Sequence, residues 1–254
     1  MKVMTFNIWN YTRPWHTRRD MIAQLIEQHR PHVVALQETR HDFRYERGKG
    51  QGEQLAELTG YYPTVALGQV YLPILRIDEC VTILTREPPL HTVTRRLARL
   101  PHEREDENQR VCVGVAVSSS GRTVYAFDTH FSLSARARLS NALEVTRFVR
   151  EEAGDSAAVL MGDLNAEPQT EPIQFLRGEY EVDGDTGDFL DCWVAAHPHD
   201  VGYTYASFGP VRRIDYVLAR NTSPDGITAQ VIGSESREGV YPSDHKGVVV
   251  ELPM

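Results

Sequence analysis

The chain has 254 residues, 41% of them hydrophobic and 24% charged, which is typical of an ordinary globular protein that can bury a substantial core. Its formal net charge of −8 argues against a protein that grips duplex DNA along a broad surface, because phosphate contacts usually need basic faces. The sequence turns polar at Asn7, too early for a signal peptide, and no apolar run approaches a membrane span, so neither is expected.

The first quarter of the chain is predicted to contain two strands and two helices. Residues 2–9 alternate and are rich in β-forming residues, residues 18–28 carry apolar positions at helical spacing, and residues 33–36 form a continuous apolar run. The polar stretch 39–52 contains several basic residues and three glycines, which indicates a mobile basic loop. A short helix is expected over residues 53–58.

The rest of the chain is predicted to hold most of the strands. A serine-rich segment at 118–122 is typical of a hairpin turn, and the charged segment 101–110 is typical of a solvated loop. Strands are expected at residues 80–85, 92–98, 111–117, 123–129, 157–161, 214–218, 227–232 and 247–252. Helices are expected at residues 134–152, 169–176 and 189–196.

No linker, low-complexity tract or repeat of fixed period divides this sequence, so we expect one domain over residues 1–254. Many strands in series among helices predict an α/β fold in which two packed sheets are flanked by helices. Cys80, Cys112 and Cys192 are scattered without paired spacing, which predicts buried thiols in a reducing compartment rather than disulfides or zinc ligands. The cytoplasm is therefore the expected location.

Several predicted strands end on an acidic, amide or imidazole residue. In the stretch MGDLNAEP a buried strand stops at a glycine and then delivers Asp163 and Asn165 before a turn. One such residue alone is most often a cap or a turn former, but repetition at six strand ends predicts a common cluster. The other polar residues at strand ends are Asn7, Glu38, His130, Asp215, Asp244 and His245.

If these strand ends converge, several carboxylates share one pocket and a cation must offset their repulsion. A hard divalent ion held by oxygen ligands does so. Carboxylate, amide and water ligands together favour Mg²⁺. The residue types therefore predict a magnesium site before any family is considered.

Seven short segments also occur in the order found in the endonuclease/exonuclease/phosphatase superfamily, which includes deoxyribonuclease-I-like enzymes: TFNIWN, LQET, DECVTILTREP, DTHFSL, GDLNAEP, RIDYVL and SDHKGVVVEL. The chain resembles this superfamily over residues 5–252. The resemblance implies a four-layer α/β/β/α sandwich of two mostly antiparallel mixed sheets flanked by helices. It also implies a metal-dependent hydrolase of phosphoric ester bonds.

The resemblance implies roles for particular residues. Glu38 matches the principal Mg²⁺ ligand, with Asn7 and Asp244 near the same ion, and Mn²⁺ is expected to substitute. The last segment departs from the usual pattern, because Lys246 and Gly247 stand where a small or aromatic residue and a proline are common. The departure affects the local turn more than the chemistry.

Asp163 matches the group that orients or deprotonates the attacking water, and Asn165 matches a donor to the phosphate. His130 and His245 match the imidazole pair that flanks the scissile phosphate. A positioned water, charge stabilisation and help for the leaving oxygen are what phosphate-ester hydrolysis needs.

Two further carboxylates match the partners of these histidines. Asp215 matches the group that orients His245, and a histidine fixed by a carboxylate has a raised pKa suited to proton donation. Glu79 matches the partner of the first histidine, although the adjacent Asp78 leaves that assignment open.

The substrate class stays open between a phosphodiester and a phosphomonoester, and between a small molecule and a nucleic acid. His130 disfavours an AP endonuclease, because those members lack histidine at the matching position. The alternative is a nuclease that uses residues 40–49 with Arg136 and Arg138 as phosphate contacts. These arginines are equally well explained as ordinary solvated surface residues. A catalytically silent binding module is a third reading, but it predicts losses among the metal and imidazole positions that this sequence does not have. No protein partner is evident.

Overall fold

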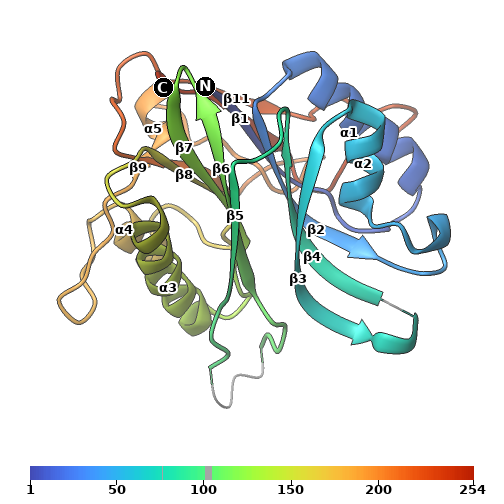
Figure 1. The fold of residues 1–254 in the computed structure, drawn as a ribbon, viewed down its shortest axis with the longest axis horizontal. Helices are drawn as coiled ribbons and strands as arrows, with labels where there is room; N and C mark the ends of the chain where they lie inside the picture. The colour runs from blue at the N-terminus through green and yellow to red at the C-terminus, as the bar shows by residue number, and fades with distance from the viewer. Residues whose placement is uncertain (76, 101–104) are drawn as a thin grey trace.

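The computed structural model of the protein describes residues 1–75, 77–100 and 105–254. Two six-stranded sheets pack face to face, and helices cover their outer faces, as Figure 1 shows. The layers therefore run α/β/β/α, which confirms the predicted sandwich.

The first sheet contains six strands in this spatial order: β11 (Thr228–Ile232), β12 (Gly247–Glu251), β1 (Lys2–Asn7), β2 (Val33–His41), β4 (Ile77–Thr85) and β3 (Tyr62–Leu72). The neighbours β1 and β2 run parallel, and the other pairs are antiparallel. Helices α1 (Trp15–His29) and α2 (Gln51–Thr59) cover its outer face. Ile22 and Ile26 of α1 belong to the same buried cluster as Phe6 and Leu36 of the sheet.

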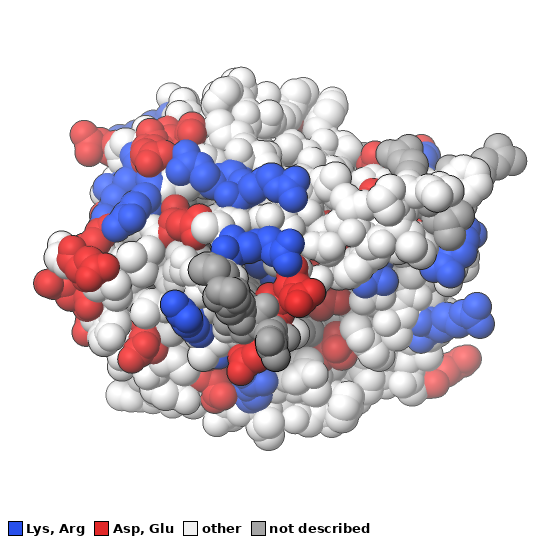
Figure 2. All heavy atoms as spheres, turned by 90° about the horizontal axis from the view of Figure 1, so that it is seen from below, with Lys and Arg blue, Asp and Glu red and all other residues white. Residues whose placement is uncertain are grey.

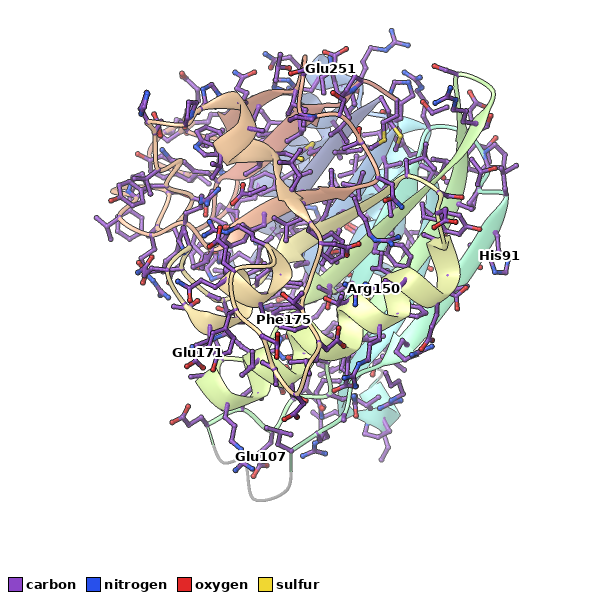
Figure 3. The ribbon with its side chains drawn as sticks, turned by 90° about the vertical axis from the view of Figure 1, so that its left-hand side faces the viewer. His91, Glu107, Arg150, Glu171, Phe175 and Glu251 are labelled. Carbon is purple, nitrogen blue, oxygen red and sulfur yellow. The ribbon has the colours of Figure 1, made fainter. Side chains whose placement is uncertain are left out.

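The second sheet has this order: β5 (His91–Arg96), β6 (Val111–Ser119), β7 (Arg122–His130), β8 (Ala158–Asp163), β10 (Asp215–Arg220) and β9 (Leu190–Asp191). Here β7 and β8 are the parallel pair. Helices α3 (Ala135–Ala153) and α4 (Glu171–Leu176) lie across its outer face, where Figure 3 labels Arg150 and Phe175. The short helix α5 (Cys192–Ala196) follows β9. None of the described helices combines the length and apolarity needed to cross a bilayer.

The space between the sheets is filled mainly by aliphatic side chains, such as Val33 and Val124. A buried polar contact also joins the two sheets. Gln37 of β2 donates from Nε2 to Oδ1 of Asp128 of β7 at 2.6 Å, and both residues are fully buried. Burial raises the pKa of Asp128 well above its ordinary value.

The structure corrects the prediction between residues 39 and 79. The stretch 39–52 is not a continuous loop, because a bulge between Leu36 and Thr39 lets β2 resume pairing with β4, and α2 already begins at Gln51. It contains one turn of 3-10 helix, Glu46–Gly48. Strand β3 was missed, and a further 3-10 turn, Pro73–Leu75, follows it.

Two later predictions also change. The helix expected at 189–196 is replaced by the short strand β9 followed by α5. In the charged segment 101–110, residues 101–104 lie outside the described residues. The side chains of Asp106 and Arg110 are 1% and 7% exposed and form an ion pair at 2.6 Å, so they are not solvated loop charges.

The predicted hairpin turn between β6 and β7 is confirmed. Ser119 pairs with Arg122, and the two residues between them, Ser120 and Gly121, have φ angles of 50° and 77°. A two-residue turn with both φ angles positive fits the right-handed twist of the strands that it joins.

Candidate active site

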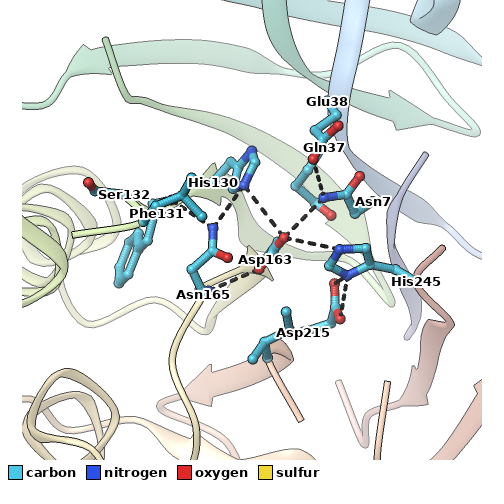
Figure 4. A network of polar contacts seen from close by, with 12 residues as sticks. Asn7, Gln37, Glu38, His130, Phe131, Ser132, Asp163, Asn165, Asp215 and His245 are labelled. Carbon is cyan, nitrogen blue, oxygen red and sulfur yellow. Dashed lines mark hydrogen bonds and ion pairs between the residues drawn. The ribbon is translucent and has the colours of Figure 1, made fainter. Parts of the chain in front are cut away.

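The predicted site residues converge at the edge of the sandwich where β1, β7 and β8 end and where β2 has its bulge. The neighbours β1 and β2 run parallel, and so do β7 and β8. The carboxyl ends of the strands in each pair therefore point to the same edge. Asp215 begins β10 beside Asp163, and His245 bonds to Asp215 from the segment before β12. Seven predicted residues line one cavity of about 310 Å³: Glu38, Glu79, His130, Asp163, Asn165, Asp244 and His245. The other two, Asn7 and Asp215, are hydrogen-bonded to Asp163 and His245 (Figure 4).

Glu38 is placed by the bulge in β2. Its φ of 54° is a left-handed conformation that is uncommon for a residue other than glycine, and such strain is found mostly at functional sites. The bulge lets Gln37 point into the protein while the Glu38 carboxylate lines the cavity. Two amides hold that carboxylate, since Asn7 donates to Oε1 at 3.1 Å and Asn10 donates to Oε2 at 3.0 Å.

Asp163 is placed by the glycine before it. Gly162 has a φ of 148°, and a Cβ built there would lie 1.9 Å from the carbonyl oxygen of Thr129, so no other residue fits this close approach. The approach sets the register of β7 and β8 in which His130 lies opposite Asp163. Asn165 then turns back with a φ of 49° and donates its backbone N–H to Oδ1 of Asp163 at 2.9 Å.

The Asp163 carboxylate lies at the centre of the cluster. Its Oδ2 accepts from Nδ2 of Asn7 at 3.0 Å, and it lies 3.5 Å from Nε2 of His130 and 3.6 Å from Nε2 of His245. Burial raises the pKa of Asp163 to about 7, against the opposing effect of the His245 cation. A carboxyl group with that pKa can take up and release a proton near neutral pH.

His245 has the character of a fixed cation. Its Nδ1 donates to both Asp215 oxygens, at 3.0 and 3.1 Å, and the Tyr205 ring lies 4.8 Å away. Burial alone would lower its pKa, but the Asp215 and Asp163 carboxylates together raise the pKa of His245 to about 10. The ring is therefore protonated at neutral pH and able to donate from Nε2.

His130 has the opposite character. Burial, with the charges of Arg110 and His245, holds the pKa of His130 well below its usual range. Nδ2 of Asn165 lies 3.0 Å from its Nε2, and since an amide nitrogen donates, Nε2 accepts and Nδ1 carries the proton. That Nδ1 lies 3.9 Å from Oε1 of Glu79, beyond hydrogen-bond distance.

The Glu79 carboxylate is held beside His130 by contacts with three other side chains. Tyr71 donates to Oε2 at 3.0 Å, and Arg40 and Arg110 lie 3.6 and 3.9 Å from its oxygens. Burial and the Glu38 charge raise the pKa of Glu79. Its neighbour Asp78 does not line the cavity, so the geometry favours Glu79 over Asp78 as the partner of the histidine.

Two arginines that the sequence did not single out also shape the site. Arg110 lines the cavity and is held by Asp106. Arg18, which is 1% exposed, donates to the carbonyl oxygens of five residues: Ile8, Trp9, Asn10, Thr12 and Pro242. It thereby fixes the loop that brings Asn10 to Glu38. Neither residue belongs to a motif, so the sequence carried no signal for them.

Two sets of ligand atoms could hold a divalent cation. Asp163, Asp215 and His245 offer atoms within 4.8 Å of one another. However, Nδ1 of His245 is engaged with Asp215, and a protonated imidazole cannot bind a metal. Glu38 and Asp244 fit better, because both are carboxylates in the cavity and the Glu38 charge adds to burial in raising the pKa of Asp244. A hard cation would relieve that repulsion.

Comparison with known proteins gives a family match and similar proteins. The model of a family described as the endonuclease/exonuclease/phosphatase family matches residues 4–245. Nocturnin of Drosophila melanogaster is 28% identical over 165 residues, which cover 63% of this chain and 25% of that protein, so the match spans about a quarter of the relative's length.

Two solved structures are similar to this one over nearly their full lengths. A functionally unknown conserved protein from Enterococcus faecalis V583 has a TM-score of 0.76 and 22% identity, with 99% of each chain covered. The mannosyl-6-phosphatase of Bacteroides thetaiotaomicron VPI-5482 has a TM-score of 0.75 and 18% identity, with 100% of each chain covered. At these identities the likeness establishes the fold.

Proposed function

This chain belongs to the endonuclease/exonuclease/phosphatase family, and from that premise we propose that it is a magnesium-dependent hydrolase of phosphate esters. The observation that carries the proposal is the placement of the Asp163 carboxylate between a protonated and a neutral histidine, His245 and His130. Titratable groups whose pKa values are shifted in opposite directions can take the separate roles of acid and base in one cavity.

Asp163 acts on the attacking water in this proposal. Asn7 and the backbone N–H of Asn165 fix its carboxylate, and its pKa of about 7 suits removal of a proton from water near neutral pH. His245, held by Asp215, donates from Nε2 to negative charge that develops on the phosphoryl group. Asn165 and His130, which line the same cavity, flank the phosphoryl group.

Glu38, Asp244 and Asn7 would hold the metal ion. Mg²⁺ bound there would stabilise negative charge on the phosphoryl oxygens, and Mn²⁺ is expected to substitute. Asn10 supports this role, because it donates to one of the Glu38 oxygens and so orients the carboxylate.

The substrate is an ester whose phosphate can enter a cavity of about 310 Å³, which suits a small phosphomonoester or phosphodiester. A nuclease is the second candidate, since Arg40, Arg110 and Arg212 line the cavity and arginine favours phosphate. Figure 2 shows basic and acidic side chains side by side on the face seen from below.

A substrate panel tests the proposal. The purified protein is assayed with Mg²⁺ or Mn²⁺ on p-nitrophenyl phosphate, bis(p-nitrophenyl) phosphate, a phosphodiester lipid and supercoiled plasmid. Asp163→Ala is expected to lower turnover by about 10³-fold, since it removes a general base, whereas Asp225→Ala on the exposed surface serves as the matched control.

The panel also separates the two candidates. Plasmid nicking that disappears in Asp163→Ala would favour a nuclease, and ester turnover without nicking would favour a small substrate. If Glu38→Gln left metal binding and all hydrolysis unchanged, the proposed mechanism would be wrong.

A further inference from the structure

Two arginines from separate elements lie at the rim of the cavity. Arg212 lines the cavity and lies in the segment that leads into β10. Arg138 lies in the first turn of α3 and donates from Nη1 to the carbonyl oxygen of Leu133 at 2.6 Å. Leu133 also lines the cavity, so both guanidinium groups are next to the same opening.

Each guanidinium is held in place and keeps free capacity to donate. Arg138 has a second, longer contact to the carbonyl oxygen of Ser132 at 3.5 Å, and its buried Nε has no hydrogen-bond partner among the described residues. Arg212 donates from Nε to Oε1 of Glu167 at 3.2 Å. A guanidinium has five N–H donors, and the contacts among the described residues leave N–H groups of both arginines for a ligand.

The contacts described above do not fully offset the positive charge of the two guanidinium groups. Burial and the Arg212 charge lower the pKa of Arg138. The first turn of α3 carries no acidic residue, so the helix N-terminus adds positive potential. In the described part of the chain, the carboxylates that face the pair are Glu105, which raises the pKa of Arg138, and Glu167, whose side chain is 36% exposed.

The other arginines that line the cavity are differently placed. Arg110 is paired with the buried carboxylate of Asp106 at 2.6 Å, and Arg40 lies between Glu79 and the ring of Tyr71. The carboxylates of those two pairs are 1% and 15% exposed, whereas the Glu167 carboxylate that pairs with Arg212 is 36% exposed, so solvent screens its charge more. Two adjacent cations held at the rim of a phosphate site indicate a place for another anion.

We propose that Arg138 and Arg212 form a second anion subsite, which binds a phosphate of the substrate other than the one that is hydrolysed. The inference rests on the proposed function. It names the substrate class as esters that carry at least two phosphates. A short oligonucleotide and a bisphosphorylated small molecule share this chemistry, and the two arms of the test distinguish them.

The first experiment measures selectivity for the second phosphate. One arm compares the dinucleotide TpT with its 5′-phosphorylated form, and the other compares fructose 1-phosphate with fructose 1,6-bisphosphate. The wild-type protein is expected to favour the second member of at least one pair. In Arg138→Gln and in Arg212→Gln the ratio of the two kcat/KM values should fall by about tenfold or more, as the loss of a charge-assisted hydrogen bond predicts.

Two variants serve as controls. Arg122→Gln removes the same charge at the opposite end of β7 and should leave the ratio as in the wild type. Arg138→Lys keeps the charge and should recover part of the ratio. A ratio unchanged in both glutamine variants, or changed equally by Arg122→Gln, would overturn the proposal.

A binding experiment keeps the inference separate from the proposed function. Inorganic pyrophosphate is titrated calorimetrically into the metal-free protein, and thermal melting checks that each variant is folded. The double variant Arg138→Gln/Arg212→Gln should bind at least about tenfold more weakly than Arg122→Gln. Equal binding would overturn the subsite even if esters were hydrolysed. Weaker binding without any ester turnover would support the subsite and refute the proposed function.

Discussion

The buried pair formed by Gln37 and Asp128 leads to a prediction about stability and pH. The substitution Asp128→Asn replaces the carboxyl group by an amide of the same shape. The amide oxygen can still accept from Nε2 of Gln37, which lies 2.6 Å from Oδ1 in the wild type. The substitution therefore keeps the hydrogen bond between the sheets and removes the group that titrates.

The size of the effect follows from the pKa of Asp128, which burial raises well above the ordinary carboxyl value of 3.8. Between these two values the folded protein keeps a proton that the unfolded chain has lost, so the free energy of unfolding falls as pH rises. The slope is about 1.4 kcal/mol for each pH unit. Asp128→Asn lacks this cost, so its stability relative to the wild type should increase by about 1.4 kcal/mol for each pH unit within that window.

The measurement is urea unfolding of both proteins at several pH values between 4 and 9, with the difference in unfolding free energy plotted against pH. Other titrating groups are shared and cancel in that difference. Asp225→Asn, on the exposed surface, should give a flat line. A flat line for Asp128→Asn, or a constant loss of stability at every pH, would refute the argument that a neutral carboxyl group joins the two sheets.

Three further substitutions test the candidate site. Asp215→Asn removes the charge that raises the pKa of His245 to about 10, so kcat should fall by about 10²-fold or more and the alkaline limb of the pH–rate profile should move to lower pH. Gly162→Ala would place a Cβ 1.9 Å from the Thr129 carbonyl oxygen, so we expect a loss of about 4 kcal/mol or more in urea unfolding, or insoluble protein. Glu38→Gln should weaken Mn²⁺ binding by about tenfold or more in calorimetric titration, since an anionic oxygen ligand becomes neutral.

The first two of these substitutions have matched controls. Asp191→Asn changes another buried aspartate of the same sheet, paired with Arg213, so it should cost stability without moving the pH–rate profile. Gly60→Ala, at a position with open space around it, should cost far less than Gly162→Ala. An unchanged alkaline limb in Asp215→Asn, or a mild effect of Gly162→Ala, would contradict the geometry.

The sequence predicted the convergence of the site because its signals are local. A buried apolar run followed by a glycine and alternating polar residues predicts where a strand ends, and this is how Asp163 and Asn165 were found. Parallel pairing of neighbouring strands then brings such ends together, as it does for His130 opposite Asp163. The layer order followed from the family resemblance and from the series of strands.

Features that depend on distant partners were not predictable in the same way. Arg110 and Asp106 lie in a charge-rich segment that has the composition of a solvated loop, and only the fold buries them together. Arg18 has the pattern of a helix surface residue, yet its guanidinium is saturated by carbonyl oxygens of a loop. The separation of histidine roles also depends on their surroundings, since His130 and His245 are the same residue type with pKa values shifted in opposite directions.

The bulge in β2 determines how the cavity can change. Beyond Glu38 the strand continues, and Arg40 pairs with Glu79 in the β2–β4 ladder. The strand that carries the proposed metal ligand therefore also forms a wall of the cavity, and that wall is tied by backbone hydrogen bonds. It cannot fold over a substrate as a lid would. A relative with a deeper or shallower site would need strands of different length beyond this bulge, whereas insertions in β2 before it would displace Glu38 from Asn7.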